Sequence, residues 1–179
     1  MATPHVARPE RGIALSSGAG FDEPMPRISA GLVMYRRRKG ELEFFLAHPG
    51  GPFSTKKDEG YWTIPKGEPE DEEPLLQVAE REFYEETGLE PHGPYIELGS
   101  IQQRGGKFVH AWAFEGDCTG PICSNTYQME WPPDSGTLCD FPEVDRAEFF
   151  PLDKARRKIK ERQFPLLERL VAALAKHPA

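Results

Sequence analysis

Residues 74–87 constrain the fold more than any other segment, because both the ends and the faces of one helix are specified there. Pro74 suits a first helical turn, and acidic residues just before it favour the positive N-terminal end. Gly88 suits the left-handed residue that follows a helix. We therefore expect a helix with one apolar stripe lying on a sheet. The stripe consists of Leu76, Ala79 and Phe83.

Strand patterns lie on both sides of this helix. Runs rich in β-branched and aromatic residues predict strands at 28–35, 43–47, 61–64, 96–103, 108–115 and 147–150. Polar turns at 36–40 and 104–107 would join two pairs of them. Residues 153–176 predict a helix that is interrupted near Pro165. Strands, helix, strands and helix in this order indicate an α/β sandwich with a mixed or largely antiparallel sheet.

Proline distribution separates the ordered domain from loops. Residues 1–26 mix Pro, Gly, Ser and charges without periodicity, and we interpret them as a loosely ordered N-terminal arm. The remaining residues, 27–179, fit one domain. Between Pro121 and Pro142 the prolines argue for loops.

Charge and cysteine content exclude several classes of protein. A formal net charge of −7 opposes binding to extended nucleic acid, which requires many Lys and Arg residues. Three cysteines without a CxxC pair favour reduced thiols over a disulfide framework or a zinc site. No apolar run reaches the roughly 18 residues that span a bilayer, and the N-terminus does not look like a signal peptide. We expect a cytoplasmic protein without membrane contact.

A group of acidic residues occupies a second face of the predicted helix. Glu82, Glu85 and Glu86 lie within little more than one turn and repel one another, and Arg81 can neutralise only one of them. Mg²⁺ prefers such carboxylate oxygens while it keeps waters and substrate phosphates in its other positions. The face is therefore a candidate metal site, although a solvated acidic surface explains the same residues.

The spacing of these residues matches a known pattern. Gly67, five residues, Glu73, seven residues and the run Arg81 to Leu89 together resemble the complete box of the Nudix family over 23 residues. The resemblance implies a Nudix-type α/β/α sandwich with a mixed sheet. It also implies a pyrophosphohydrolase, an enzyme that cleaves phosphoanhydride bonds.

The resemblance also implies roles for single residues. Glu82 and Glu86 would bind magnesium directly, and Glu85 would bind it directly or through water. The backbone carbonyl of Lys66 would be a further ligand, and Mn²⁺ would substitute for Mg²⁺. Arg81 and Glu73 would form an ion pair that holds the catalytic glutamates in position.

The general base differs between branches of the family, which take it from the box or from a later loop. Glu143, in the segment 141–145, resembles the late-loop glutamate of the branches that hydrolyse dinucleoside polyphosphates or RNA 5′-pyrophosphates. An ordinary loop acid is the competing interpretation. The implied reaction is attack of water on phosphorus without a covalent intermediate.

The substrate is less constrained than the chemistry. Trp62 to Gly67 resembles the W-x-x-PKG segment of hydrolases that act on diadenosine polyphosphates and diphosphoinositol polyphosphates. Lys56, Lys57, Lys66 and Arg104 are candidates to hold phosphates, although the first two are equally well explained as solvated lysines. The segment 104–108 lacks the tyrosine expected there in diadenosine polyphosphate hydrolases.

The predicted function is Mg²⁺-dependent hydrolysis of a nucleoside diphosphate-linked substrate, a dinucleoside polyphosphate or a nucleoside triphosphate. Hydrolysis of a diphosphoinositol polyphosphate or of an RNA 5′-pyrophosphate is the alternative within the same chemistry. A Nudix module that binds nucleotides without turnover is the alternative from another class. The partner would be a small molecule, and both a monomer and a homodimer stay open.

Overall fold

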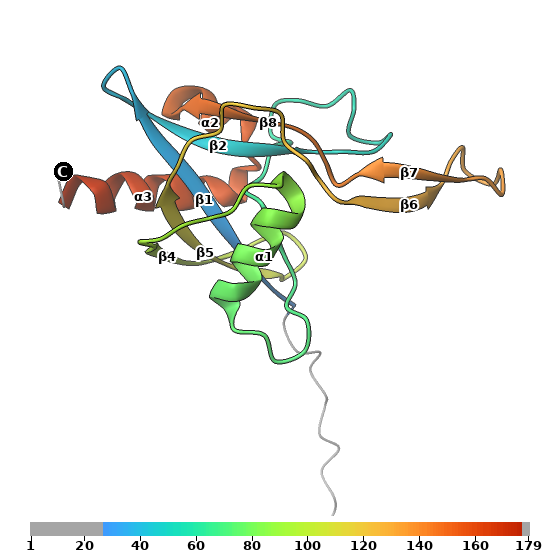
Figure 1. The fold of residues 1–179 in the computed structure, drawn as a ribbon, viewed down its shortest axis with the longest axis horizontal. Helices are drawn as coiled ribbons and strands as arrows, with labels where there is room; N and C mark the ends of the chain where they lie inside the picture. The colour runs from blue at the N-terminus through green and yellow to red at the C-terminus, as the bar shows by residue number, and fades with distance from the viewer. Residues whose placement is uncertain (1–26, 177–179) are drawn as a thin grey trace, which may run out of the picture.

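The chain folds around one mixed sheet with helices on both faces (Figure 1), as a computed structural model of residues 27–176 shows. The predicted arm, residues 1–26, lies outside the described residues. Strand order is β4-β5-β1-β2-β8, with β3 paired to β1. Strands β1 and β5 are parallel, and the other pairs are antiparallel. The strands are β1 (Ile28–Arg38), β2 (Glu41–Pro49), β3 (Lys66–Gly67), β4 (Ile96–Gln102), β5 (Phe108–Glu115) and β8 (Val144–Pro151).

Helices cover the two faces through separate apolar clusters. Helix α1 (Leu75–Thr87) packs on one face, and α2 (Leu152–Lys158) with α3 (Phe164–Lys176) packs on the other. Successive residues of β1 alternate between the clusters, because side chains of a strand point to opposite faces. Leu32 joins the α1 cluster and Val33 the α3 cluster. The predicted α/β/α sandwich with a mixed sheet is confirmed.

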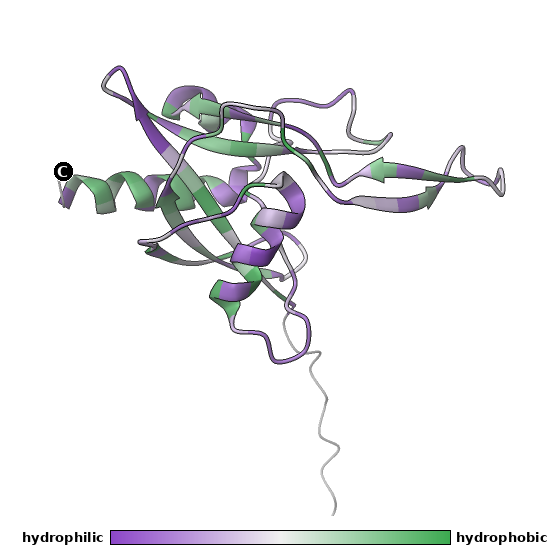
Figure 2. Cartoon of the chain, in the orientation of Figure 1, coloured by the Kyte–Doolittle hydropathy of each residue, from purple (hydrophilic) through white to green (hydrophobic). Residues whose placement is uncertain are grey.

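Helix α1 follows the prediction closely at its ends. It begins one residue after Pro74, and Gly88 ends it in the left-handed region with φ of 73°. Its buried face differs slightly from the predicted stripe, because Val78 and Thr87 are buried while Leu76 is only partly buried. Figure 2 shows the opposite side of the helix as hydrophilic.

Several predicted elements differ from the structure in their bounds or their type. Strand β1 continues to Arg38, so the turn consists of Lys39 and Gly40, which both have positive φ. Residues 61–64 make only isolated bridges instead of a strand. The break in the last helical segment comes before Pro165, which lies in the first turn of α3, where its missing N–H costs nothing. A 3₁₀ turn, η1 (Glu161–Gln163), fills part of that break.

The proline-rich stretch that predicts loops contains a β-hairpin. Strands β6 (Thr126–Glu130) and β7 (Leu138–Pro142) pair antiparallel and project from the body (Figure 1). Met129 faces Cys139 on the partly buried side. Pro132 and Pro133 lie in the connecting turn, so the prolines mark the ends of strands that the pattern did not reveal.

Gln163 joins the C-terminal segment to the strand region before β3. Its side chain is fully buried, and its Oε1 accepts hydrogen bonds from the Ile64 amide and the Thr63 hydroxyl at 3.0 Å each. Its Nε2 donates to the Thr63 hydroxyl at 2.9 Å. These bonds fix the path of the chain into β3. Within residues 27–176, no helix is long and apolar enough to cross a membrane.

Replacing Gln163 by leucine tests this connection. We expect Gln163→Leu to lower the free energy of unfolding by about 1–3 kcal/mol, because the buried Ile64 amide loses its acceptor. Urea denaturation measures the effect. Glu168→Ala, an exposed change on α3, serves as control and should stay within about 0.5 kcal/mol of the wild type. Wild-type stability of Gln163→Leu would contradict the connection.

Candidate active site

Two glycines let three segments of the site pack closely. Strand β3 pairs with β1, so that Gly67 lies opposite Ala30 and Lys66 opposite Gly31. A Cβ atom on Gly67 would lie 2.0 Å from the carboxyl carbon of Glu82, and one on Gly31 would lie 2.5 Å from the Pro65 carbonyl oxygen. The Glu82 carboxylate therefore rests directly on the backbone of Gly67.

Arg81 connects several acids around this contact. Its guanidinium donates to Glu73 at 2.9 Å, to Glu82 at 2.9 Å and to Glu85 at 3.3 Å. It also donates to the backbone carbonyl of Glu68 at 3.1 Å. The hydrogen bond to Glu73 is the main reason why the pKa of Arg81 lies above its usual value, and Arg81 in turn lowers the pKa of Glu73. The loop before α1 is thus held to the acidic face.

Glu86 forms no ion pair with another side chain among residues 27–176. The Lys66 amide donates to its Oε2 at 3.2 Å. Burial raises the pKa of Glu86 from 4.5 to about 8, attraction to Lys66 opposes the rise, and repulsion by Glu82 and Glu143 adds to it. Burial also raises the pKa of Glu82, against the effect of Arg81 and with that of Glu85 and Glu143. Three acids from two segments therefore lie close enough to repel one another.

A short loop segment brings Glu143 to the acids of α1. The amide of Asn125 donates to the Glu85 carbonyl at 2.8 Å, and the carbonyl of Asn125 accepts from the Glu143 amide at 2.9 Å. The carbonyl of Glu143 accepts from the Gly50 amide at 2.9 Å. Asn125 thus satisfies a carbonyl at the end of α1 that lacks a helical partner. Sequence reasoning missed this segment, because backbone hydrogen bonds leave no side-chain pattern.

His48 holds the start of β8 against the neighbouring loop. It is fully buried, with Nδ1 2.7 Å from Asp145 Oδ1 and Nε2 2.7 Å from the carbonyl oxygen of Lys57. The Lys57 side chain contacts Tyr61, where its Nζ lies 4.5 Å from the ring centre. Lys56 is exposed. The structure therefore shows no contact of either lysine with the acids within the described residues.

Lys66 and Lys160 supply positive charge beside the acids. Burial lowers the pKa of both lysines, Glu86 opposes the shift in each, and the two also repel each other. Lys160 comes from the segment between α2 and η1 and was not predicted, since a single lysine after a helix has no distinguishing pattern. It lines a hollow of about 390 Å³ together with Arg104.

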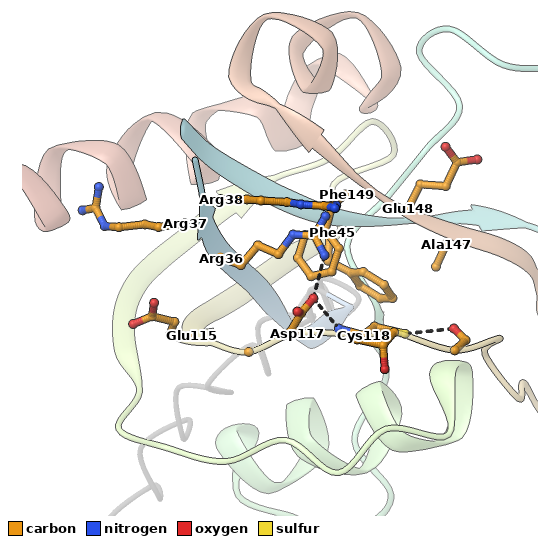
Figure 3. Close-up of a pocket in the computed structure, with 13 residues that line it drawn as sticks. Arg36, Arg37, Arg38, Phe45, Glu115, Asp117, Cys118, Ala147, Glu148 and Phe149 are labelled. Atoms are coloured by element: carbon orange, nitrogen blue, oxygen red, sulfur yellow. Dashed lines mark hydrogen bonds and ion pairs between the residues drawn. The ribbon is translucent and has the colours of Figure 1, made fainter. Parts of the chain in front are cut away.

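A separate hollow of about 940 Å³ lies at the C-terminal end of β1 (Figure 3). Its wall contains Arg36, which pairs with Glu43 and Asp117 at 2.6 Å each and lies 3.9 Å above the Phe149 ring. These pairs already neutralise the Arg36 charge. None of the predicted site residues lines this hollow, so we do not place the active site there.

The NUDIX domain family matches residues 25–170 of the sequence. This chain belongs to the Nudix family. The match covers most of the chain and includes every residue of the acidic site described above, so the resemblance seen in the sequence is confirmed. The expectation of a Nudix pyrophosphohydrolase is confirmed with it. No curated protein sequence matches the chain significantly.

Solved structures give the same assignment. An Ap4A hydrolase of C. elegans in a binary complex is 24% identical, with 84% of this chain and 98% of that chain covered and a TM-score of 0.59. Another structure of C. elegans Ap4A hydrolase is 26% identical over 84% of this chain and 99% of that one, with a TM-score of 0.53. The NUDIX domain of Shewanella oneidensis NrtR, complexed with ADP ribose, is 15% identical, covers 83% and 88%, and has a TM-score of 0.61.

Replacing Gly67 by alanine tests whether the Glu82 contact matters. The added Cβ would meet the carboxylate at 2.0 to 2.1 Å and must displace it. We expect Gly67→Ala to lower the kcat for phosphoanhydride hydrolysis by about 10- to 100-fold, the cost typical of disturbing groups that orient a metal or catalytic ligand. Steady-state kinetics measures this, with circular dichroism to monitor folding.

Gly120→Ala is the matched control, because nothing lies within 4 Å of its added Cβ. It should leave kcat unchanged. Full activity of a folded Gly67→Ala protein would show that the position of Glu82 is not critical.

Proposed function

We propose that this Nudix protein is a Mg²⁺-dependent hydrolase that cleaves a phosphoanhydride bond in a dinucleoside polyphosphate. One observation carries the proposal: Glu82, Glu86 and Glu143 lie close enough to repel one another, and Lys66 and Lys160 both lie within electrostatic reach of Glu86. Uncompensated acids next to lysines suit a ligand that combines a cation with phosphates. The likeness to solved structures of C. elegans Ap4A hydrolase supports the substrate class.

The donor groups fit magnesium in their chemistry. Glu86 is a partly buried carboxylate whose charge has no full partner, and a divalent cation would supply one. Among residues 27–176, no three acidic, histidine or cysteine side chains form a ready cage for a metal. Mg²⁺ does not require one, because it is usually bound by one or two carboxylates together with waters and substrate phosphates.

We assign the metal to Glu82 and Glu86, with Glu85 through water and the Lys66 carbonyl as further ligands. When bound, Mg²⁺ or Mn²⁺ polarises the phosphoryl oxygens and offsets the charge that develops on them. Arg81 and Glu73 act as positioning residues, since Arg81 spans the loop before α1 and the acids of its face.

Glu143 is the proposed general base. It lies at an exposed corner next to the acids of α1, where a water and a substrate can both reach it. In the reaction the water oxygen bonds to phosphorus, its proton passes to Glu143, and the bridging P–O bond breaks with its electron pair on the leaving phosphate. Lys66 and Arg104 would hold the phosphates. Lys56 and Lys57 would act earlier, by attracting the substrate to the loop that carries them.

A panel of substrates tests the proposal. It contains diadenosine tetraphosphate, ADP-ribose, a nucleoside triphosphate, an RNA 5′-pyrophosphate and a diphosphoinositol polyphosphate, each with Mg²⁺ in ¹⁸O-labelled water. We expect the highest kcat/KM for diadenosine tetraphosphate, with ¹⁸O in one phosphate product. A higher kcat/KM for another compound of the panel would show that the proposed substrate class is wrong. No turnover of any of them would support a Nudix module that binds without catalysis.

Replacing Glu86 by glutamine separates catalysis from folding. We expect Glu86→Gln to reduce kcat by at least about 10²–10³-fold, because the loss of a metal ligand should cost at least as much as the loss of one group that stabilises the transition state. The exposed Glu90 just beyond α1 offers a matched control, and Glu90→Gln should keep wild-type kcat. An equal kcat for the wild type and Glu86→Gln would show that Glu86 is not a metal ligand.

Metal binding should also release a proton. The raised pKa of Glu86, about 8, leaves its carboxyl mostly protonated at pH 7 in the metal-free protein, and a cation binds only the ionised form. Calorimetric titration with MgCl₂ at pH 7, in buffers of different ionisation enthalpy, measures the release. Glu86→Gln should abolish it.

The same pKa predicts how pH changes stability. The Glu86 carboxyl loses its proton near pH 4.5 in the unfolded chain and near pH 8 in the folded chain. The stability that protonated Glu86 gives the metal-free protein is therefore present below pH 4.5 and is lost as pH rises through about 8. Melting temperatures of the wild type should fall over this range relative to those of Glu86→Gln. If the melting temperatures of the two proteins changed with pH in the same way, the raised pKa of Glu86 would be contradicted.

A further inference from the structure

The hollow beside the acids has an unusual charge. Its lining consists of Gly60, Gln103, Arg104, Lys160, Glu161 and Arg162, and we call it the cationic hollow. Three of these six residues are cations and one is an anion. Its volume of about 390 Å³ lies at the lower end of the range for small-ligand sites. The lining comes from the turn between β4 and β5, the loop before β3 and the segment around η1.

The backbone at Lys160 is held firmly, although it lies between two helical elements. Its amide donates to the Trp62 carbonyl at 2.8 Å, and the Trp62 amide donates to the Lys158 carbonyl at 3.0 Å. Ile159 and Gln163, on either side, are buried. Lys160 is therefore placed at the hollow by the core of the protein and not by a loose loop.

The three cations of the hollow lack partners in the part of the chain that the structure describes. No side-chain hydrogen bond or ion pair joins Lys160, Arg104 or Arg162 to residues 27–176. By contrast, nearby Lys107 pairs with Glu68 at 2.9 Å, and Lys158 pairs with Asp58. Three cations held close together repel one another, and the single acid of the lining, Glu161, cannot offset all three, so the hollow suits an anion.

The hollow adjoins the catalytic acids through Lys160. This lysine is partly buried and lies within electrostatic reach of both Lys66 and Glu86. A phosphate chain that meets the glutamates and Lys66 can therefore continue to Lys160. Arginine binds phosphate through paired N–H groups and lysine binds it as a point charge, so both residue types suit the same ligand.

We propose that Lys160, together with Arg104 and Arg162, binds the substrate phosphates that lie beyond the bond cleaved at the glutamates, and so selects substrates with three or more consecutive phosphates. This inference rests on the proposed function and deepens it. In a substrate with only two bridging phosphates, both phosphates bind near the acids. No phosphate is then left to bind in the cationic hollow. Lys160 is then a residue that determines specificity by direct contact with substrate.

Binding of inorganic polyphosphates tests the inference apart from nucleotide hydrolysis. Calorimetry with the full chain in the presence of Mg²⁺ compares tripolyphosphate with pyrophosphate. We expect wild type to bind tripolyphosphate more tightly. Lys160→Met should weaken tripolyphosphate binding about tenfold, as for the loss of one charged hydrogen bond, and change pyrophosphate binding less than about twofold. Lys154→Met, at an exposed lysine of α2 outside the hollow, should match the wild type for both ligands.

The outcomes separate this inference from the proposed function. Equal tripolyphosphate affinity of wild type and Lys160→Met overturns the subsite, even where diadenosine tetraphosphate is hydrolysed. Binding that depends on Lys160 in a protein without turnover of the substrate panel sustains the subsite and overturns the hydrolase. Should Lys160→Met fail to fold, Arg104→Met in the exposed turn carries the same test with the same expected loss.

Discussion

The contact between the Glu82 carboxylate and the backbone of Gly67 sets the spacing of the whole site. It requires a residue without a side chain at Gly67, and Gly31 likewise lets β1 meet the segment before β3. A larger residue at Gly67 would displace the Glu82 carboxylate, and one at Gly31 would clash with the Pro65 carbonyl oxygen. The distances from the acids of α1 to Lys66 and to Glu143 all follow from this approach, because those groups lie on segments attached to the same sheet.

Charge balance is the second constraint, because the charged residues of the site come from separate segments of the chain. Arg81 neutralises part of the acidic face and ties it to Glu73, which leaves Glu86 as the acid with the weakest compensation. Lys66 and Lys160 bring cations within electrostatic reach of Glu86. A folded protein tolerates such neighbouring clusters of acids and lysines when a bound ligand neutralises the charges in both. Stability of the empty site is thus lower than it would be with neutral residues, and binding recovers the difference.

Local signals explain which elements the sequence predicted. Helix α1 has a proline before its first turn, a glycine after its last and a period that places acids and apolar residues on different sides, and all three depend only on near neighbours. The hairpin of β6 and β7 has no such signal, because its strands are short, exposed and bordered by prolines. The break after α2 was misplaced for a similar reason: the backbone there is set by hydrogen bonds to Trp62, about 100 residues earlier in the chain.

The sequence by itself predicted the α/β/α fold and the family. It also placed Arg81, Glu82 and Glu86 on one helix with Glu73 just before it, because the spacing of a helix and its caps is encoded locally. Only the tertiary structure decided that Glu143 joins these acids through Asn125, that Lys57 turns to Tyr61, and that Lys160 meets Arg104 at the cationic hollow. Those relations arise from backbone hydrogen bonds and packing between distant segments, and such contacts depend on how the sheet brings the segments together, which no short stretch of sequence contains.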